Sequence, residues 1–172
     1  MPGARKSRTT EKDAIALLKD DHQQVRSLLG ELEATTEKAA GKREKLLATI
    51  EQELTVHTRI EEEIFYPAFR EAARKKDDGK LYFEALEEHH VVDMVLPEIK
   101  GTSVESEQFA AKAKVLKDLV EHHAEEEETE MFPRARKLMT RDELLRLGAE
   151  MARLKASIAR GLVGRLAGLV GA

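Results

Sequence analysis

The chain contains no cysteine. This absence excludes a disulfide framework, a redox thiol, and any zinc or iron–sulfur site that depends on thiolate ligands. Proline and glycine are also few, with 4 and 10 copies in 172 residues, while long runs are rich in Ala, Glu, Lys, Leu and Arg. With 41% hydrophobic and 36% charged residues, this composition is typical of an all-helical protein with a single core.

The net charge and the two ends of the chain indicate which location and which partners to expect. The net charge of −4 argues against a dedicated nucleic-acid surface, so no specific nucleic-acid partner is expected, although residues 1–12 are locally basic. Residues 1–9 are expected to be a flexible basic leader. No apolar segment follows this start, so no signal peptide is predicted and a cytoplasmic location is expected. The apolar C-terminal stretch is too short to span a bilayer, so no transmembrane segment is expected.

One eleven-residue pattern occurs twice in the chain. In each copy a histidine is followed four residues later by a glutamate, then by an apolar–aromatic pair, and then by a proline. On a helix, residues i and i+4 lie on one face, so each copy presents an imidazole and a carboxylate together. These two ligand types suit iron, zinc and manganese. The repeat therefore predicts two matching pairs of metal ligands. They are His57 with Glu61, and His123 with Glu127.

Two further histidines precede the two copies at corresponding places. Aligning His22 with His89 superposes the apolar residues that follow each of them. Aligning it with His90 instead puts Asp93 and Pro97 on apolar positions, so the repeat favours His89 and leaves His90 as the alternative. A single histidine on an apolar stripe is usually a core residue. Four helices with one each indicate a shared site, because burying unpaired imidazoles and carboxylates costs several kcal/mol.

Apolar residues at helical spacing predict four helices of similar length within residues 10–139. Short loops join them, so the sequence predicts an all-α fold, an antiparallel up-down-up-down four-helix bundle. One of the joining segments is expected to be a turn over residues 75–80, in which Gly79 marks the end of a helix.

An additional C-terminal helix is predicted after the bundle. Thr140 and Glu143 form a capping box at its start, and apolar residues at helical spacing extend it over residues 140–160. Residues 161–172 are then expected to form a glycine-rich apolar tail.

The order of the histidines and glutamates resembles a known signature. His, His-x-x-x-Glu, His, His-x-x-x-Glu is typical of hemerythrin-like, or HHE cation-binding, domains. In this chain the pattern is carried by His22, His57, Glu61, His89, His123 and Glu127. The resemblance implies that the four histidines ligate two non-haem Fe ions, that both glutamates bridge the ions, and that an oxo or hydroxo group forms a further bridge. It also implies a small partner, namely dioxygen, another diatomic ligand or peroxide.

The sequence departs from the oxygen-carrying branch of this family by one histidine. One turn to either side of His89 stand Ala85 and Asp93, where that branch has a further imidazole. Asp93, His90, His122 and water are the candidates for the missing ligand. An open metal position suits chemistry or ligand exchange, so the chain is interpreted as a sensor or a reactive centre rather than an oxygen carrier.

The remaining residues of the two copies are given ordinary structural roles. Phe65, Tyr66 and Phe132 are expected to be core aromatics. The glutamates at other positions of the two acidic runs, including Glu62 and Glu128, are expected to face solvent.

Two functional hypotheses follow. The first is a hemerythrin-like di-iron protein that binds or reacts with dioxygen, peroxide or nitric oxide in oxidant sensing or protection. The second is a sensor or binding module for iron or another divalent metal, in which metal binding orders the bundle and a protein partner reads that order. The residues do not decide whether the chain is an enzyme or in which oligomeric state it acts.

Overall fold

The computed structural model describes residues 12–73 and 76–170, and these residues form helices and short connections without any strand. The predicted leader lies outside this part of the chain. The α-helices are α1 (Ala14–Glu33), α2 (Ala40–Ile60), α3 (Tyr66–Ala72), α4 (Lys76–Lys100), α5 (Glu107–Glu126), α6 (Phe132–Leu138) and α7 (Arg141–Val170). A short 3-10 helix, η1 (Glu37–Ala39), precedes α2, and two π-helical turns, η2 (Glu61–Phe65) and η3 (Glu127–Met131), follow α2 and α5.

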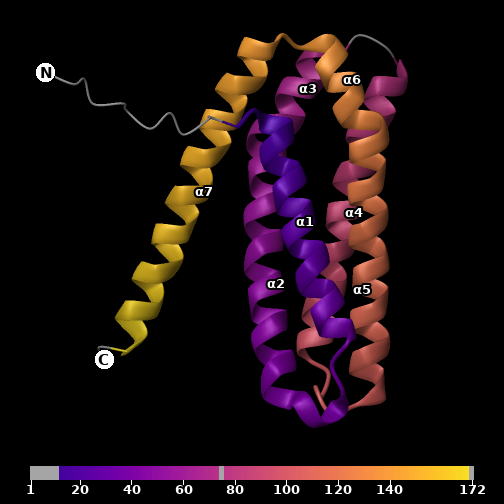
Figure 1. Ribbon diagram of the computed structural model, residues 1–172, viewed down its shortest axis with the longest axis vertical. Helices are drawn as coiled ribbons and strands as arrows, with labels where there is room; N and C mark the ends of the chain where they lie inside the picture. The colour runs from indigo at the N-terminus through magenta and orange to yellow at the C-terminus, as the bar shows by residue number, and fades with distance from the viewer. Residues whose placement is uncertain (1–11, 74–75, 171–172) are drawn as a thin grey trace, which may run out of the picture.

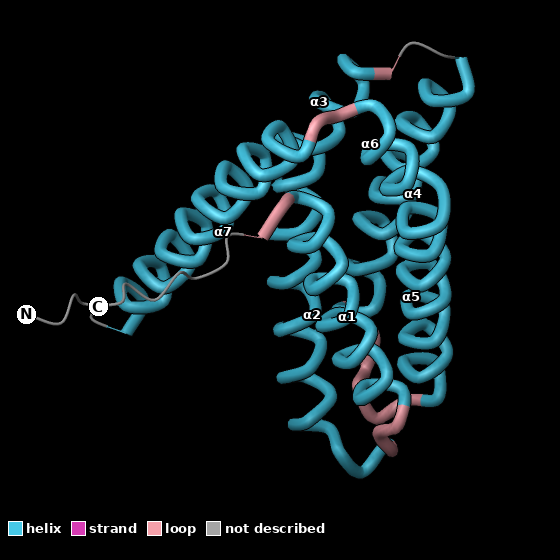
Figure 2. Tube along the Cα trace, turned by 45° about the horizontal axis from the view of Figure 1, so that its top comes forward, coloured by secondary structure: helices cyan, strands magenta, loops and turns pink. Residues whose placement is uncertain are grey.

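Figure 1 shows α1, α2, α4 and α5 side by side, with each running opposite to the helix before it. The predicted antiparallel bundle with an additional helix is therefore confirmed. Helix α7 leaves the end of the bundle and slants away from it in both views (Figures 1 and 2). None of the described helices is both long and apolar enough to cross a membrane.

Each copy of the eleven-residue pattern folds in the same way. Helix α2 passes through the π turn η2 into α3, and α5 passes through η3 into α6. The prolines, Pro67 and Pro133, stand at the start of α3 and α6. Proline has no N–H and its ring clashes with the carbonyl four residues earlier, so the preceding turn widens. The wide turn begins at Glu61 in one copy and at Glu127 in the other.

The core is divided into two apolar clusters along the bundle axis. The upper cluster, as Figure 1 is drawn, contains the buried aromatics Phe65, Phe69 and Phe132, and is covered by Leu144 and Met151 of α7. The lower cluster is aliphatic apart from one phenylalanine and joins α1, α2, α4 and α5. The histidines of the predicted site lie between the two clusters. The fold thus keeps its polar residues in the middle, with apolar packing on both sides.

The expected turn before α4 is wrong from Lys76 onward, because that stretch is helical. Asp78 is buried there and accepts two hydrogen bonds from Arg134 of α6, at 2.6 and 3.0 Å. Gly79 faces Arg70 of α3, and a Cβ at this position would lie 3.2 Å from its guanidinium. Gly79 thus lies inside α4 and does not end a helix. Arg134 is 56 residues from Asp78, so local signals did not reveal this pair.

Helix α7 begins as predicted, since Glu143 accepts from the backbone N–H of Thr140 at 2.7 Å and donates its own N–H to the Thr140 hydroxyl at 3.3 Å. It continues to Val170, through most of the stretch expected to be a tail. Glycine lowers helix propensity by about 1 kcal/mol but does not interrupt the helix as proline does.

One glycine of α7 allows the helix to touch the start of α1. A Cβ at Gly148 would lie 2.8 Å from the backbone N of Ala14 and closer still to the carbonyl O of Lys12. Such contacts between backbone atoms leave no room for any side chain, so only glycine fits here.

We predict that Gly148→Ala destabilises the protein by about 1–3 kcal/mol, as forced overpacking does. For a chain of this length the melting temperature should fall by roughly 2–12 °C in a calorimetric scan. Gly161→Ala on the same helix is the matched control, because a Cβ there meets no atom within 4 Å. It should leave the melting temperature unchanged or raise it, since alanine favours the helix. Equal effects of the two substitutions would contradict the packing argument.

Candidate metal centre

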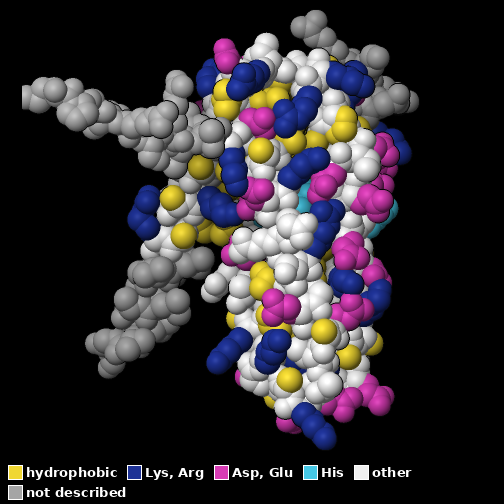
Figure 3. Space-filling view, in the orientation of Figure 1, with side chains coloured by type: hydrophobic (Ala, Val, Ile, Leu, Met, Phe, Trp, Pro, Cys, Tyr) yellow, Lys and Arg dark blue, Asp and Glu magenta, His cyan; other side chains and the backbone are white. Residues whose placement is uncertain are grey.

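Four imidazoles meet halfway along the bundle, one from each long helix. His22 comes from α1, His57 from α2, His89 from α4 and His123 from α5. All four residues are between 3% and 6% exposed, and little histidine surface appears in Figure 3. The ring centroids of His22 and His57, here called the first pair, are 4.8 Å apart. Those of His89 and His123, the second pair, are 4.7 Å apart.

Glu61 joins the two pairs from one side. It is fully buried at the start of η2. Its Oε2 lies 3.2 Å from Nε2 of His57 and 3.3 Å from Nε2 of His89. One carboxylate oxygen thus faces an imidazole of each pair.

Glu127 occupies the corresponding place in the second copy. It is 2% exposed at the start of η3. Its Oε2 lies 3.2 Å from Nε2 of His22 and 3.7 Å from Nε2 of His123. Both predicted glutamates therefore stand between the pairs, each with one oxygen facing an imidazole of either pair.

Tyr66 brings a further oxygen into the cluster. Its hydroxyl lies 3.3 Å from Nε2 of His89 and 3.5 Å from Oε2 of Glu61, and its ring stacks on His89 at 5.5 Å. At the equivalent place in the second copy, Phe132 stacks on His22 at 5.7 Å and has no hydroxyl. The expectation that Tyr66 is only a core aromatic therefore missed its hydroxyl. This phenol lies on the second-pair side, where the sequence is one imidazole short.

A carboxylate stands behind every imidazole, on the side away from the cluster. The distances from Nδ1 to the nearest carboxylate oxygen are 2.9 Å for His22 and Glu128, 2.8 Å for His89 and Glu62, 2.8 Å for His123 and Glu88, and 3.9 Å for His57 and Asp21. An imidazole that gives its Nδ1–H to a carboxylate is held with Nε2 toward the metal, and its basicity increases. Three of the four rings are fixed in this way.

The sequence contains a signal for these carboxylates. Each one is the immediate chain neighbour of a predicted ligand. They are Asp21 before His22, Glu62 after Glu61, Glu88 before His89 and Glu128 after Glu127. The expectation that the acidic runs face only solvent overlooked that a partly exposed glutamate can also reach a buried imidazole. The Glu128 side chain is 23% exposed and that of Glu62 is 44% exposed.

Cations support the two carboxylates behind the first pair. Arg26 donates to Glu128 at 2.7 Å. Lys155 of α7 pairs with Asp21. The carboxylates behind the second pair, Glu62 and Glu88, have no Lys or Arg partner among the described residues.

The three additional candidates do not reach the cluster. His90 and Asp93 are exposed on the outer face of α4. The side chain of His122 is 63% exposed, and its Nε2 lies 3.7 Å from Glu88 and 3.5 Å from Glu126 at the surface. Of the two alternatives in α4, it is His89 whose side chain points inward.

Burial changes the pKa values of the ionisable groups. It lowers the pKa of His57 to about 4, so this imidazole is neutral at pH 7, as a metal ligand must be. Burial, reinforced by the nearby charge of Glu127, raises the pKa of Glu61 well above its usual value. Burial opposes ionisation of Glu127 too, but the imidazoles of His123 and His22 outweigh it and lower its pKa. The two carboxylates thus repel each other, and a cation between them would allow both to ionise.

Several polar atoms of the cluster have no hydrogen-bond partner within the described part of the chain. Those that belong to the predicted ligands and face the cluster are Nε2 of His22, Nε2 of His57, Oε1 of Glu61, and both Oε1 and Oε2 of Glu127. Each buried unpaired group costs about 1–3 kcal/mol. Donor atoms of five predicted ligands also lie within 4.8 Å of one another. Bound metal cations would give these atoms partners, so the residues present fit the kind of cation that the sequence implies.

A small cavity adjoins the four imidazoles. Its volume is about 20 Å³, and its apolar wall includes Val25, Leu54, Val92 and Val120. A cavity of this size holds about one water molecule. Only a very small molecule can therefore approach the histidines from this side.

A buried group of imidazoles and carboxylates inside an antiparallel bundle defines the chain as a metal-binding helical protein. The sequence model of the hemerythrin HHE cation-binding domain matches residues 13–135. The chain therefore belongs to the hemerythrin HHE cation-binding family, whose domains bind metal cations.

Two relatives extend this comparison. A crystal structure described as a hemerythrin HHE cation-binding domain-containing protein, the Rv2633c homologue of Mycobacterium kansasii, is 27% identical, with a TM-score of 0.78 over 90% of this chain and 92% of that chain. A curated protein of Nostoc sp. strain PCC 7120, described as a DNA nickase, is 27% identical over 166 residues. The match covers 96% of this chain but 45% of that relative, so the chain spans less than half of the relative's length.

We predict that a divalent metal stabilises the chelator-treated protein. Ferrous iron at about 100 times its Kd should add about 2.7 kcal/mol to the free energy of unfolding. The melting temperature should then rise by roughly 5–11 °C, measured anaerobically. His57→Ala should lose most of this rise, whereas His122→Ala, at an exposed position, should keep it. A full rise in His57→Ala would remove His57 from the ligand set.

Proposed function

We propose that the chain holds two non-haem iron ions and uses them to bind or react with dioxygen, peroxide or nitric oxide, in oxidant sensing or protection. The observation that carries the proposal is the position of Glu61 and Glu127 between the two pairs of imidazoles, at 3.2–3.7 Å from one ring of each pair. The six predicted ligands and the Tyr66 hydroxyl together make seven donor groups, so one six-coordinate ion would leave part of this set unused. Two ions, one for each pair, would use all of it.

The kinds of donor atom favour iron. Imidazole, carboxylate and phenol are nitrogen and oxygen ligands of intermediate hardness, and the chain has no thiolate for a softer metal. Four histidines and two glutamates in this order are also the pattern by which the chain resembles hemerythrin-like domains, for which di-iron centres are expected.

The two metal positions would differ in the number of protein ligands. The second pair has the Tyr66 hydroxyl beside it, whereas the first pair has Phe132 at the equivalent place. The position at the first pair would thus keep more room for a ligand from solution. Two adjacent irons can exchange two electrons with a small oxidant and so avoid releasing a radical.

The protein's own groups would set the conditions for this chemistry. The carboxylates behind the rings hold Nε2 toward the cluster and increase its basicity. The two apolar clusters exclude water from above and below, and the cavity of about 20 Å³ beside the imidazoles has room for a molecule of about the size of water.

The name of the Nostoc relative does not lead us to propose DNA cleavage by this chain. A phosphodiester would have to reach side chains of residues that are 0–6% exposed, through a cavity of about one water molecule. The net charge of −4 also gives no general attraction for DNA. The relative has more than half of its length outside the matched region, where that activity could reside.

We predict that iron-loaded protein changes its near-ultraviolet and visible absorption within seconds of mixing with hydrogen peroxide or nitric oxide. Rapid-mixing spectroscopy measures the change, and zinc-loaded protein is the control, because zinc fits similar donors but has no redox chemistry. Iron-loaded protein that responds to dioxygen, peroxide and nitric oxide no more than zinc-loaded protein would refute the proposed function while leaving metal binding intact.

A further inference from the structure

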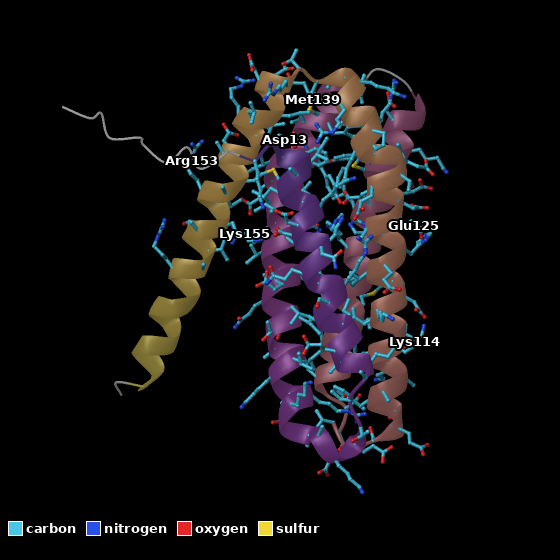
Figure 4. All side chains as sticks on the ribbon, in the orientation of Figure 1. Asp13, Lys114, Glu125, Met139, Arg153 and Lys155 are labelled. Atoms are coloured by element: carbon cyan, nitrogen blue, oxygen red, sulfur yellow. The ribbon has the colours of Figure 1, made fainter. Side chains whose placement is uncertain are left out.

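Helix α7 reaches the metal centre through one side chain. Lys155 lies between α7 and the bundle, whereas Arg153, two residues earlier, lies on the outer side of the helix (Figure 4). The Lys155 ammonium group pairs with Oδ1 of Asp21, 134 residues away on α1. Asp21 is 5% exposed and directly precedes His22. The pair therefore joins the fifth helix to the layer of carboxylates behind the imidazoles.

The second oxygen of Asp21 faces His57 without bonding to it. Oδ2 of Asp21 is 3.9 Å from Nδ1 of His57, which is beyond hydrogen-bond distance. Both atoms are buried and have no other hydrogen-bond partner among the described residues. The Nδ1 atoms of the other three imidazoles are 2.8–2.9 Å from their carboxylates. His57 is thus the ring that the layer of carboxylates holds least firmly.

The position of Asp21 reflects a competition between two groups. An imidazole that binds a metal through Nε2 carries its proton on Nδ1 and needs an acceptor there. Asp21 is the acceptor within reach, but a Lys ammonium is a full charge and attracts the same carboxylate more strongly than a neutral N–H does. An approach of about 1 Å would complete the bond to His57, and leaving that buried N–H unpaired is costly. Without Lys155, Asp21 would be free to make this approach.

We propose that Lys155 is a positioning residue of the metal centre, which holds Asp21 away from His57 and thereby weakens the hold of His57 on its metal. Metal retention at the first pair is then tied to the docking of α7 on the bundle. This inference rests on the proposed metal-binding function, and it assigns to the fifth helix a role in that function.

The test compares two substitutions that each remove one positive charge from α7. Full-length Lys155→Met and Arg153→Met are loaded with cobalt(II), and release of cobalt to an excess of chelator is followed at pH 7. Lys155→Met should release the cobalt of the first pair, which is the faster-released fraction in wild type, about 10 times more slowly than wild type, the lower end of the effects seen for changes behind a metal ligand. Arg153→Met should match wild type, and Lys155→Arg should restore the wild-type rate.

Two further measurements distinguish a positioning role of Lys155 from a general structural effect. The visible ligand-field bands of bound cobalt should shift in Lys155→Met and stay in place in Arg153→Met, because only the former changes the environment of His57. In an Asp21→Asn background, Lys155→Met should no longer slow release, because the charge that Lys155 holds has been removed. The melting temperatures of the metal-free variants report any loss of α7 docking.

Release from Lys155→Met at the rate of Arg153→Met, or faster, would overturn the inference. So would an equal slowing in the Asp21→Asn background. If wild-type protein binds no cobalt at the predicted ligands, the proposed metal centre fails and this inference fails with it. If two ions bind but Lys155→Met does not slow their release, the inference about Lys155 is refuted and the proposed metal centre stands.

Discussion

Burial of charge in the middle of the bundle is the constraint on which the rest of the structure depends. Four imidazoles and two carboxylates occupy a layer where a folded helical protein normally places leucine and valine. Unpaired, such groups would cost more than the bundle's net stability of about 5–15 kcal/mol allows. The apolar clusters above and below exclude water from the layer, and the carboxylates behind the rings supply partners for Nδ1. Bound metal would supply partners for the imidazole nitrogens and carboxylate oxygens that still face one another without hydrogen bonds.

The two halves of the chain complete each other at this layer. Helices α1 and α2 form one half, and α4 and α5 the other, with the same order of ligands. His22 of the first half is supported by Glu128 of the second, and His89 of the second by Glu62 of the first. Each half therefore depends on the other to orient one of its two histidines. Two features break the symmetry, namely the hydroxyl of Tyr66 on the second-pair side and the arrival of α7 on the first-pair side. Both make the two halves chemically unequal.

A feature could be predicted from the sequence where residues close together in the chain determine it. The spacing of His57 and Glu61 on one helical face, and the register that favours His89 over His90, are local. Six residues could therefore be predicted as ligands, and the structure brings their side chains together. The role of Tyr66 was missed because an aromatic residue before proline is usually a core residue, and its hydroxyl reaches the cluster from the end of a π turn. The link from Lys155 to Asp21 spans 134 residues, and that from Asp78 to Arg134 spans 56. No local pattern encodes such pairs.

The most direct measurement is anomalous diffraction at the iron absorption edge from crystals of the iron-loaded protein. Our account predicts two iron peaks per chain, one at the first pair and one at the second, with Glu61 and Glu127 between them and the Tyr66 oxygen bonded to the iron of the second pair. A single peak, or peaks only at surface groups such as His122 with Glu88 and Glu126, would contradict it.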